Sequence, residues 1–241
     1  AECTLKPECL NQVFHAIEFH GADPGRLMAE IMGRATGYCG GKSGTLHVSA
    51  KELGVVLTST IVGGELSLAP GVALSVQMKG GDQVVACFFG DGAACEGIFH
   101  EALNLAAVWK LPVLFVCENN EWQAFVHRRE TMLTQDIASR AAAYGIEGKT
   151  VDGNDAEAVL AAATEAVAKV RATRMPFLLE TKTYRLRGHF EPDDQGYVDK
   201  AELASWKARD PIAALRARLL ESGALTADGA AAIERRVAGR L

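Results

Sequence analysis

The chain has 241 residues, of which 49% are apolar and 23% charged, a mixture typical of a globular protein below the size at which single cores divide into domains. Thirty acidic and 25 basic residues give a net charge of -5 without a basic block, which argues against a protein that binds nucleic acid through phosphate contacts. The weakly polar stretch 61–78 is interrupted by Glu65, Pro70 and Gln77, so we expect no membrane span. The first residues show no cationic region followed by an apolar one, so we expect no export signal.

The cysteines are too sparse for a disulfide scaffold, and no Cys-x-x-Cys pair or Cys/His cluster has metal-ligand spacing. We therefore expect reduced thiols and a cytoplasmic protein, with Cys87 and Cys117 packed inside apolar runs. The six cysteines are Cys3, Cys9, Cys39, Cys87, Cys95 and Cys117.

Two short apolar runs rich in Val and Phe, 84–89 and 111–117, have the pattern of buried parallel strands. Between them, apolar residues recur at helical spacing from Ile98 to Trp109, while Glu101 and Asn104 occupy the other face. Strand, helix and strand within about thirty residues predict a βαβ unit.

The pattern repeats downstream. We predict a strand over 147–151, an Ala-rich helix over 155–171 capped by Asn154 or Asp155, and a strand over 177–184. The alternation predicts an α/β fold, a doubly wound and mainly parallel sheet with helices on both faces.

The polar segment 187–197 lacks periodicity and is predicted to be an exposed loop. Helices are expected from about residue 199, where Asp199 and Glu202 form a variant of the capping box. Further along, Pro211 suits the first turn of a helix and Gly223 suits a stop. No linker or internal repeat interrupts the chain, so we predict one domain over 1–241.

Polar residues follow the first two predicted strands at the same edge of the sheet. Gly90-Asp91-Gly92 ends the first strand, and Asn119-Asn120 follows the second. By itself Gly-Asp-Gly is a common turn, but a carboxylate meeting an amide oxygen suits Mg²⁺. A helix starting after Gly92 would direct its N-terminal amides at a diphosphate, and Gly92 and Ala93 leave room for a close approach.

Gly-Asp-Gly, twenty-six residues and Asn-Asn resemble the thiamine diphosphate motif, and five motifs, one of which contains this Asn-Asn pair, occur in the order of one family. They are GKSGTLH (41–47), IVGG (61–64), FHEALN (99–104), ENN (118–120) and YRLRGH (184–189). From about Gly21 to its end, the chain resembles the α subunit of the thiamine-dependent dehydrogenase component of 2-oxo acid and acetoin dehydrogenase complexes.

The resemblance implies that Asp91, the Asn120 side chain and the Trp122 backbone carbonyl bind Mg²⁺. It implies that Arg185 meets the diphosphate, a contact for which a guanidinium is well shaped, and that His189 acts on the reacting substrate or lipoyl group.

His47, at the end of the Gly-rich loop, is a weaker catalytic candidate. Thr60 and Val62 match positions beside the thiazolium. Glu96 and Glu101 lie near the motif, and we interpret them as solvated or structural. The cofactor-binding set implied by the resemblance is Thr60, Val62, Gly90, Asp91, Gly92, Ala93, Asn120, Arg185 and His189.

The resemblance also implies the reaction, in which thiamine diphosphate carries out decarboxylation or cleavage of a small 2-oxo acid or acetoin and the acyl group passes to lipoamide. A glutamate on a separate β chain would activate the cofactor. The expected assembly is therefore a heterotetramer of two α and two β subunits, associated with a lipoyl acyltransferase core.

A truncated, non-catalytic cofactor-binding or assembly module is the alternative. A free-standing thiamine enzyme would need a pyrimidine-binding domain that this length does not accommodate.

The chain departs from the family pattern at three places. Family members carry a longer N-terminal part with a Tyr-Arg pair and a nearby His, which 11–20 does not reproduce, so that part is expected to be missing or altered. Gln123 stands where small residues are usual, and the Trp122-Gln123 variation favours an acetoin-like subgroup. Phe190 replaces a regulatory phosphoserine of animal mitochondrial pyruvate dehydrogenases, so that switch is not expected here.

Overall fold

The computed structural model describes residues 21–190 and 192–239, so the departure expected in 11–20 lies outside the described residues. At its centre is a four-stranded sheet in the order β1-β2-β6-β5, and every neighbouring pair is parallel. The four strands are β1 (Val85–Gly90), β2 (Val113–Asn119), β5 (Glu147–Asp152) and β6 (Phe177–Lys182). All four coincide with the predicted strands to within two residues at each end, and the predicted parallel α/β sheet is confirmed.

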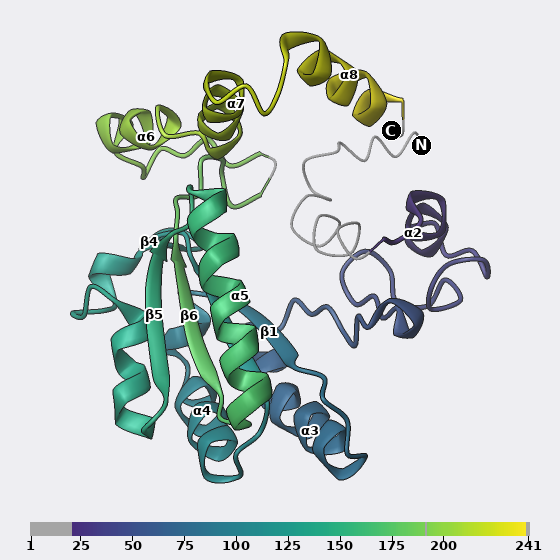
Figure 1. The fold of residues 1–241 in the computed structure, drawn as a ribbon, viewed down its shortest axis with the longest axis vertical. Helices are drawn as coiled ribbons and strands as arrows, with labels where there is room; N and C mark the ends of the chain where they lie inside the picture. Colours follow the sequence, from purple (N-terminus) through teal and green to yellow (C-terminus); the bar gives the residue numbers. More distant parts are fainter. Residues whose placement is uncertain (1–20, 191, 240–241) are drawn as a thin grey trace.

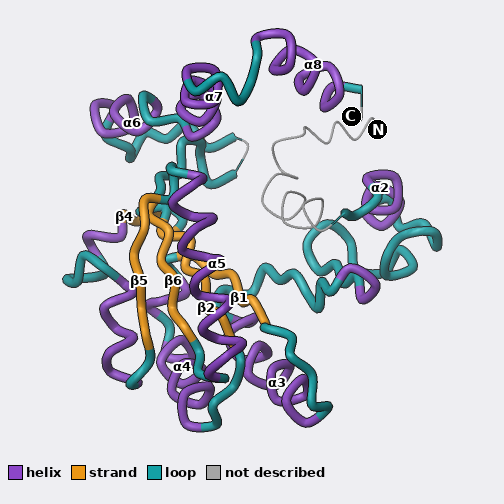
Figure 2. The backbone as a smooth tube through the Cα atoms, in the orientation of Figure 1, coloured by secondary structure: helices purple, strands orange, loops and turns teal. Residues whose placement is uncertain are grey.

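Helices cover both faces of this sheet (Figures 1 and 2). One face packs against α3 (Gly64–Met78), α4 (Gly97–Val108) and the 3-10 helix Ile137–Tyr144, around Phe99, Phe115 and Leu178. The other face packs against α5 (Ala156–Thr173), whose small residues Ala162 and Ala166 let the helix lie close to the strands. Parallel strands alternate their side chains between two apolar layers, as the continuous apolar runs predicted.

The predicted caps differ in outcome. Asp155 caps α5 by accepting hydrogen bonds from the N–H groups of Glu157 and Ala158, and Asp199 caps α6 (Lys200–Lys207) in the same way. The reciprocal half of the predicted capping box is wrong, because the Glu202 carboxylate turns to His127 instead, at 3.3 Å. Pro211 opens α7 (Pro211–Glu221) as predicted, and α8 (Ala227–Ala238) completes the helical part.

The first part of the described chain lies beside the sheet (Figure 1). It contains α2 (Pro24–Ile31), the 3-10 turn Lys51–Leu53 and a small cluster around Leu27 and Val48. The Glu30 side chain, fully buried, accepts hydrogen bonds from the backbone N–H groups of Cys39, Gly41 and Ser43 and from the Ser43 hydroxyl. A single carboxylate therefore organises the loop that precedes His47.

The carboxyl ends of the four strands lie together, at the upper edge of the sheet in Figure 1, near β4 and α6. The hairpin of β3 (Trp122–Gln123) and β4 (Val126–His127) follows β2 at this edge, and the 3-10 turn Arg128–Glu130 follows the hairpin. Cys87 and Cys117 are buried as predicted, and Cys39 and Cys95 are also free thiols. In the described ranges, no helix combines the length and apolar character needed to cross a bilayer.

Candidate functional site

Asp91 lies directly after β1 and is fully buried. Its Oδ1 accepts a hydrogen bond from the backbone N–H of Asn120 at 3.3 Å, so the two sheet-edge signals meet as the sequence predicted. Its Oδ2 is buried and has no hydrogen-bond partner among the residues that the structure describes. Burial raises the pKa of Asp91 above its ordinary value, and the Asn120 N–H acts in the opposite direction.

The segment after Asp91 corrects one expectation. A helix does not begin directly after Gly92: a 3-10 turn, Ala93–Cys95, comes first, and α4 starts at Gly97. The reason is local, because Glu96 adopts an extended conformation (φ -77°, ψ 149°) that interrupts helical hydrogen bonding. The amides nearest Asp91 therefore belong to the 3-10 turn. Glu96 and Glu101 are exposed, in keeping with our interpretation of them as solvated.

The turn after β2 carries the other two expected metal ligands. Asn120 Oδ1 accepts a hydrogen bond from the Trp122 N–H at 3.0 Å, and Asn119 Oδ1 accepts one from the Glu121 N–H at 3.2 Å. Glu121 has a φ of +65°, a conformation rare for a residue with a side chain. The tight turn brings the backbone N–H of Asn120 to Asp91 and leads into the hairpin that begins at Trp122.

Arg185 and His189 lie next to this hairpin. The backbone N–H of Arg185 donates to the Asn120 carbonyl at 3.1 Å, and its guanidinium Nη2 donates to the Ala124 carbonyl and to the Tyr197 hydroxyl, both at 2.7 Å. Arg185 Nη1 is 3.5 Å from His189 Nδ1. The structure therefore brings Asp91, Asn120, Arg185 and His189 to one edge of the sheet.

The loop that carries His189 is irregular and largely exposed, as predicted, but it is held by one carboxylate. Asp193 accepts hydrogen bonds from the backbone N–H groups of His189 (2.6 Å) and Gln195 (2.9 Å) and from the Tyr197 hydroxyl (2.7 Å). The Tyr197 hydroxyl keeps the pKa of Asp193 below its ordinary value against the effect of burial. Phe125 packs edge-on against the His189 ring.

His47, Thr60 and Val62 form a separate group. Thr60 Oγ1 lies 3.3 Å from His47 Nε2, and all three side chains are exposed. Gly63, which follows Val62, packs closely against the first turn of α4, because a Cβ atom on Gly63 would lie 2.9 Å from Cγ2 of Ile98. Val62 therefore lies beside the beginning of α4, a few residues after Asp91. In the described part of the chain, no hydrogen bond or ring contact joins His47 to Arg185 or His189, so its catalytic role stays a prediction.

Gln123 lies next to Gly92, where the sequence predicted room for a close approach of the diphosphate. A Cβ atom on Gly92 would lie 3.4 Å from Gln123 Cγ, and Gln123 Nε2 is 3.6 Å from Cys95 Sγ. The Gln123 side chain therefore lies over the Gly90-Asp91-Gly92 turn, where a smaller residue would leave Gly92 uncovered.

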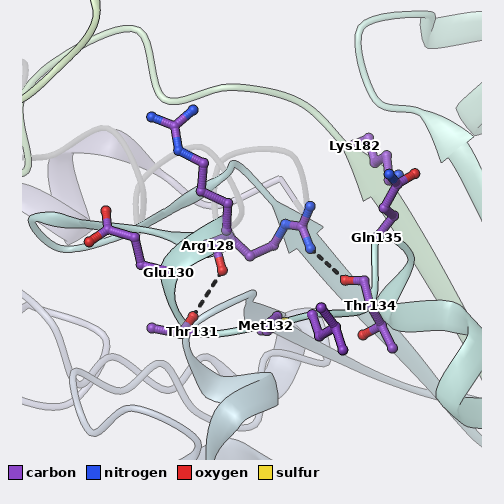
Figure 3. A pocket seen from close by; sticks show the side chains of 9 residues that line it. Arg128, Glu130, Thr131, Met132, Thr134, Gln135 and Lys182 are labelled. Carbon is purple, nitrogen blue, oxygen red and sulfur yellow. Dashed lines mark hydrogen bonds between the residues drawn. The ribbon is translucent and has the colours of Figure 1, made fainter.

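A cavity of about 610 Å³ lies next to this edge (Figure 3). Arg128 lines the cavity and joins it to the turn that follows β2, because Nε donates to Glu121 Oε2 at 3.0 Å while Nη1 donates to the Thr134 carbonyl at 2.8 Å. None of the predicted cofactor ligands lines this cavity. The residues around it are Arg128, Arg129, Glu130, Thr131, Met132, Leu133, Thr134, Gln135 and Lys182.

The oxygen atoms at the sheet edge fit a hard divalent cation. Asp91 Oδ2 is a buried carboxylate oxygen without a partner, and an amide oxygen such as Asn120 Oδ1 has a second lone pair beyond its bond to Trp122. Across the described residues, no group of three or more His, Cys, Asp or Glu side chains could hold a metal ion. The candidate ligand set is thus one carboxylate with amide and carbonyl oxygens, which favours Mg²⁺ over zinc.

Sequence reasoning missed two residues that shape this edge. Glu180, in the middle of β6, is fully buried and accepts a hydrogen bond from Asn119 Nδ2 at 2.7 Å. His127, in β4, is buried between Trp122 and Glu202. The sequence could have indicated that Glu180 is buried, because it continues the apolar run Phe-Leu-Leu of a predicted strand. No sequence pattern marked His127, because its burial depends on the β3–β4 hairpin.

Comparison with known proteins identifies the class of this fold and site. The family model described as "Dehydrogenase E1 component" matches residues 14–241. The chain therefore belongs to the dehydrogenase E1 component family.

Individual relatives agree with this assignment. The α subunit of acetoin:2,6-dichlorophenolindophenol oxidoreductase from Bacillus subtilis is 48% identical over 76% of this chain and 55% of its own length. The pyruvate dehydrogenase E1 component subunit alpha of Rhizobium meliloti is 40% identical over 88% of this chain and 61% of its own length. The α subunit of acetoin:2,6-dichlorophenolindophenol oxidoreductase from Cupriavidus necator is 39% identical over 92% of this chain and 67% of its own length. The chain thus spans between 55% and 67% of the length of these relatives.

Proposed function

We propose that this chain is the α subunit of a thiamine diphosphate-dependent E1 dehydrogenase and that it holds Mg²⁺ and the diphosphate of the cofactor at the carboxyl edge of its sheet. The observation that carries the proposal is the buried Asp91 carboxylate: Oδ1 accepts the Asn120 N–H, and Oδ2 has no hydrogen-bond partner among the described residues. Arg185 is bonded to the same turn. A buried carboxylate oxygen without a donor is costly, and a cation removes that cost.

Each residue has a distinct part in this proposal. Asp91, the Asn120 side chain and the Trp122 carbonyl would hold Mg²⁺, and the metal would supply positive charge for the diphosphate. Arg185, fixed by Ala124 and Tyr197, would keep a guanidinium N–H directed at the diphosphate. Thiamine diphosphate supplies, when bound, the electron sink for carbon-carbon bond cleavage. His189, exposed and next to Arg185, would hydrogen-bond the reacting group.

The wider assembly belongs to the same proposal. A β chain would supply the glutamate that activates the cofactor, in a heterotetramer that passes its acyl group to lipoamide on an acyltransferase core in the cytoplasm. A small 2-oxo acid or acetoin would be the substrate. The 48% identity to a relative named for acetoin oxidation supports acetoin.

Calorimetric titration of Mg²⁺ and thiamine diphosphate into the chain, co-purified with a β subunit of this family, tests the proposal. Asp91→Ala should abolish Mg²⁺-dependent binding while the fold survives, because among the described residues the side chain accepts a single hydrogen bond from another residue, the Asn120 N–H. Asp82→Ala, an exposed carboxylate before β1, is the matched control and should bind as the wild type does. Equal cofactor affinity in all three proteins would refute the proposal. A chain that binds cofactor in the assembly but supports no turnover would indicate the non-catalytic alternative.

A further inference from the structure

Glu180 is a buried carboxylate at a position where the sheet otherwise carries apolar side chains. It lies in β6, pairs in register with Cys117 of β2 and has no exposed surface. Burying a carboxylate is unfavourable unless hydrogen bonds compensate, and a Leu or Val at this position would avoid the cost. The retention of an anion here calls for a role that an apolar side chain could not fill.

Three donors from three elements converge on this carboxylate. Oε1 accepts from Asn119 Nδ2 at 2.7 Å, and Oε2 accepts from the Ala138 N–H at 2.9 Å and the Thr150 hydroxyl at 3.0 Å. Ala138 and Thr150 connect Glu180 to the 3-10 helix Ile137–Tyr144 and to β5. Asn119 alone connects it to the turn that carries the expected metal ligands.

The bond to Asn119 determines which way the Asn119 amide points. Because a carboxylate only accepts, Asn119 must present its NH₂ to Glu180 and its oxygen to the Glu121 N–H, the 3.2 Å bond that closes the turn. The Asn119 carbonyl also accepts from the Thr183 N–H at 2.8 Å. Asn119, fully buried, is therefore held at both ends of its side chain and at its backbone.

We infer that Glu180 is a positioning residue for the metal site: through Asn119 it holds the Asn119–Trp122 turn in the conformation that presents Asn120 and the Trp122 carbonyl to Mg²⁺. The inference rests on the proposed function. Outer partners that orient metal ligands commonly change metal affinity by 10- to 100-fold when they are removed.

Glu180→Gln tests the inference because it replaces one carboxylate oxygen with an NH₂ group. If the NH₂ faces Asn119, that amide must flip and lose its bond to the Glu121 N–H; if it faces Ala138, a backbone donor loses its partner and Asn119 keeps only a neutral acceptor. Thr150→Val is the matched control, since it removes one hydrogen bond from the same carboxylate and leaves Asn119 bonded. Asn119→Ala removes the connection to Glu180 together with the bond from the Glu121 N–H, and it leaves Glu180 bonded to Ala138 and Thr150.

Mg²⁺ affinity is measured calorimetrically at saturating thiamine diphosphate in the chain co-purified with its β subunit, and the melting temperature of each variant is recorded. We expect at least tenfold weaker Mg²⁺ binding in Glu180→Gln and Asn119→Ala and less than twofold change in Thr150→Val, although all three lower the melting temperature. Equal loss of affinity in Thr150→Val, or unchanged affinity in Asn119→Ala, would overturn the inference. Should Glu180→Gln fail to fold, Asn119→Asp takes its place, because it keeps an oxygen for the Glu121 N–H and removes the donor to Glu180; unchanged Mg²⁺ affinity in that variant would overturn the inference. A wild-type protein that binds no Mg²⁺ would instead overturn the proposed function on which the inference rests.

Discussion

Replacing Glu30 with Gln should destabilise the loop that leads to His47, and should do so in a pH-dependent way. Burial acts to raise the pKa of Glu30, but hydrogen bonds from Ser43, Gly41 and Cys39 outweigh it and lower the pKa from 4.5 to about 2. At about 1.4 kcal/mol for each pH unit, this difference sets an upper bound of about 3.5 kcal/mol on the stabilisation that the charge provides. We expect Glu30→Gln to lower the stability of this loop by about 2 to 3 kcal/mol at pH 7.

The structure explains why Gln cannot replace Glu here. Oε2 accepts two backbone N–H groups and Oε1 accepts a third, and backbone donors cannot reverse their role. The NH₂ group of a Gln would face at least one of these N–H groups in either orientation. The substitution therefore leaves a buried donor without an acceptor as well as removing the charge.

Because the folded pKa is lowered, the stabilisation is present above about pH 4.5 and is lost as the pH falls towards 2. Hydrogen exchange of the Cys39, Gly41 and Ser43 amides measures it directly. At pH 7 these amides should exchange roughly 30- to 150-fold faster in Glu30→Gln, and the ratio to wild type should shrink below pH 4.5. Glu52→Gln, which removes only an exposed ion pair with Arg26, should exchange as the wild type does. A ratio independent of pH, or equal effects of the two variants, would refute the reasoning.

Three further predictions concern the site and its supports. His189→Ala should lower kcat of the assembled enzyme while thiamine diphosphate affinity stays within about twofold, because a group that acts on the reacting intermediate contributes to the transition state; normal turnover would remove His189 from the site. Tyr197→Phe should weaken thiamine diphosphate binding about fivefold in calorimetry, because Arg185 loses one of its two 2.7 Å anchors, and unchanged affinity would show that the anchor is dispensable. Gly63→Ala should lower the free energy of unfolding in urea by about 1 to 3 kcal/mol more than Gly54→Ala does. Both glycines have φ near +74°, but only at Gly63 would the new Cβ lie 2.9 Å from a methyl group of α4, and equal losses would contradict this reasoning.

The strands, and the residues that directly follow them, could be predicted from the sequence. The four strands were found because buried parallel strands are short, continuous apolar runs, and Asp91 was placed near Asn120 because each follows such a strand. Helix α3 was missed, since Pro70 and a nearly uniform distribution of apolar residues hide its periodicity. The β3–β4 hairpin was missed because its strands have only two residues each.

Contacts made by backbone donors were beyond the reach of sequence patterns. Glu30 is bonded to N–H groups nine to thirteen residues further along, and every residue except proline offers such a group, so no residue type marks the partner. The usual expectation that Glu is exposed then misleads. The network of Asp193, Tyr197 and Arg185 was likewise hidden in a segment whose polar composition predicted only an exposed loop.

The buried carboxylates together give the strongest internal argument for the site. In the part of the chain that the structure describes, Glu30, Asp91 and Glu180 are carboxylates with no exposed surface. Glu30 and Glu180 each have donors at both oxygens, as buried polar groups require, whereas Asp91 has one 3.3 Å bond and an oxygen with no donor. A fold that satisfies two such groups completely and leaves the third open, at the carboxyl edge of a parallel sheet, is arranged to complete the third with something other than protein. A cation bound at Asp91 would supply the missing partner, and this is why Asp91 is expected to be a ligand while Glu30 and Glu180 support the loops around it.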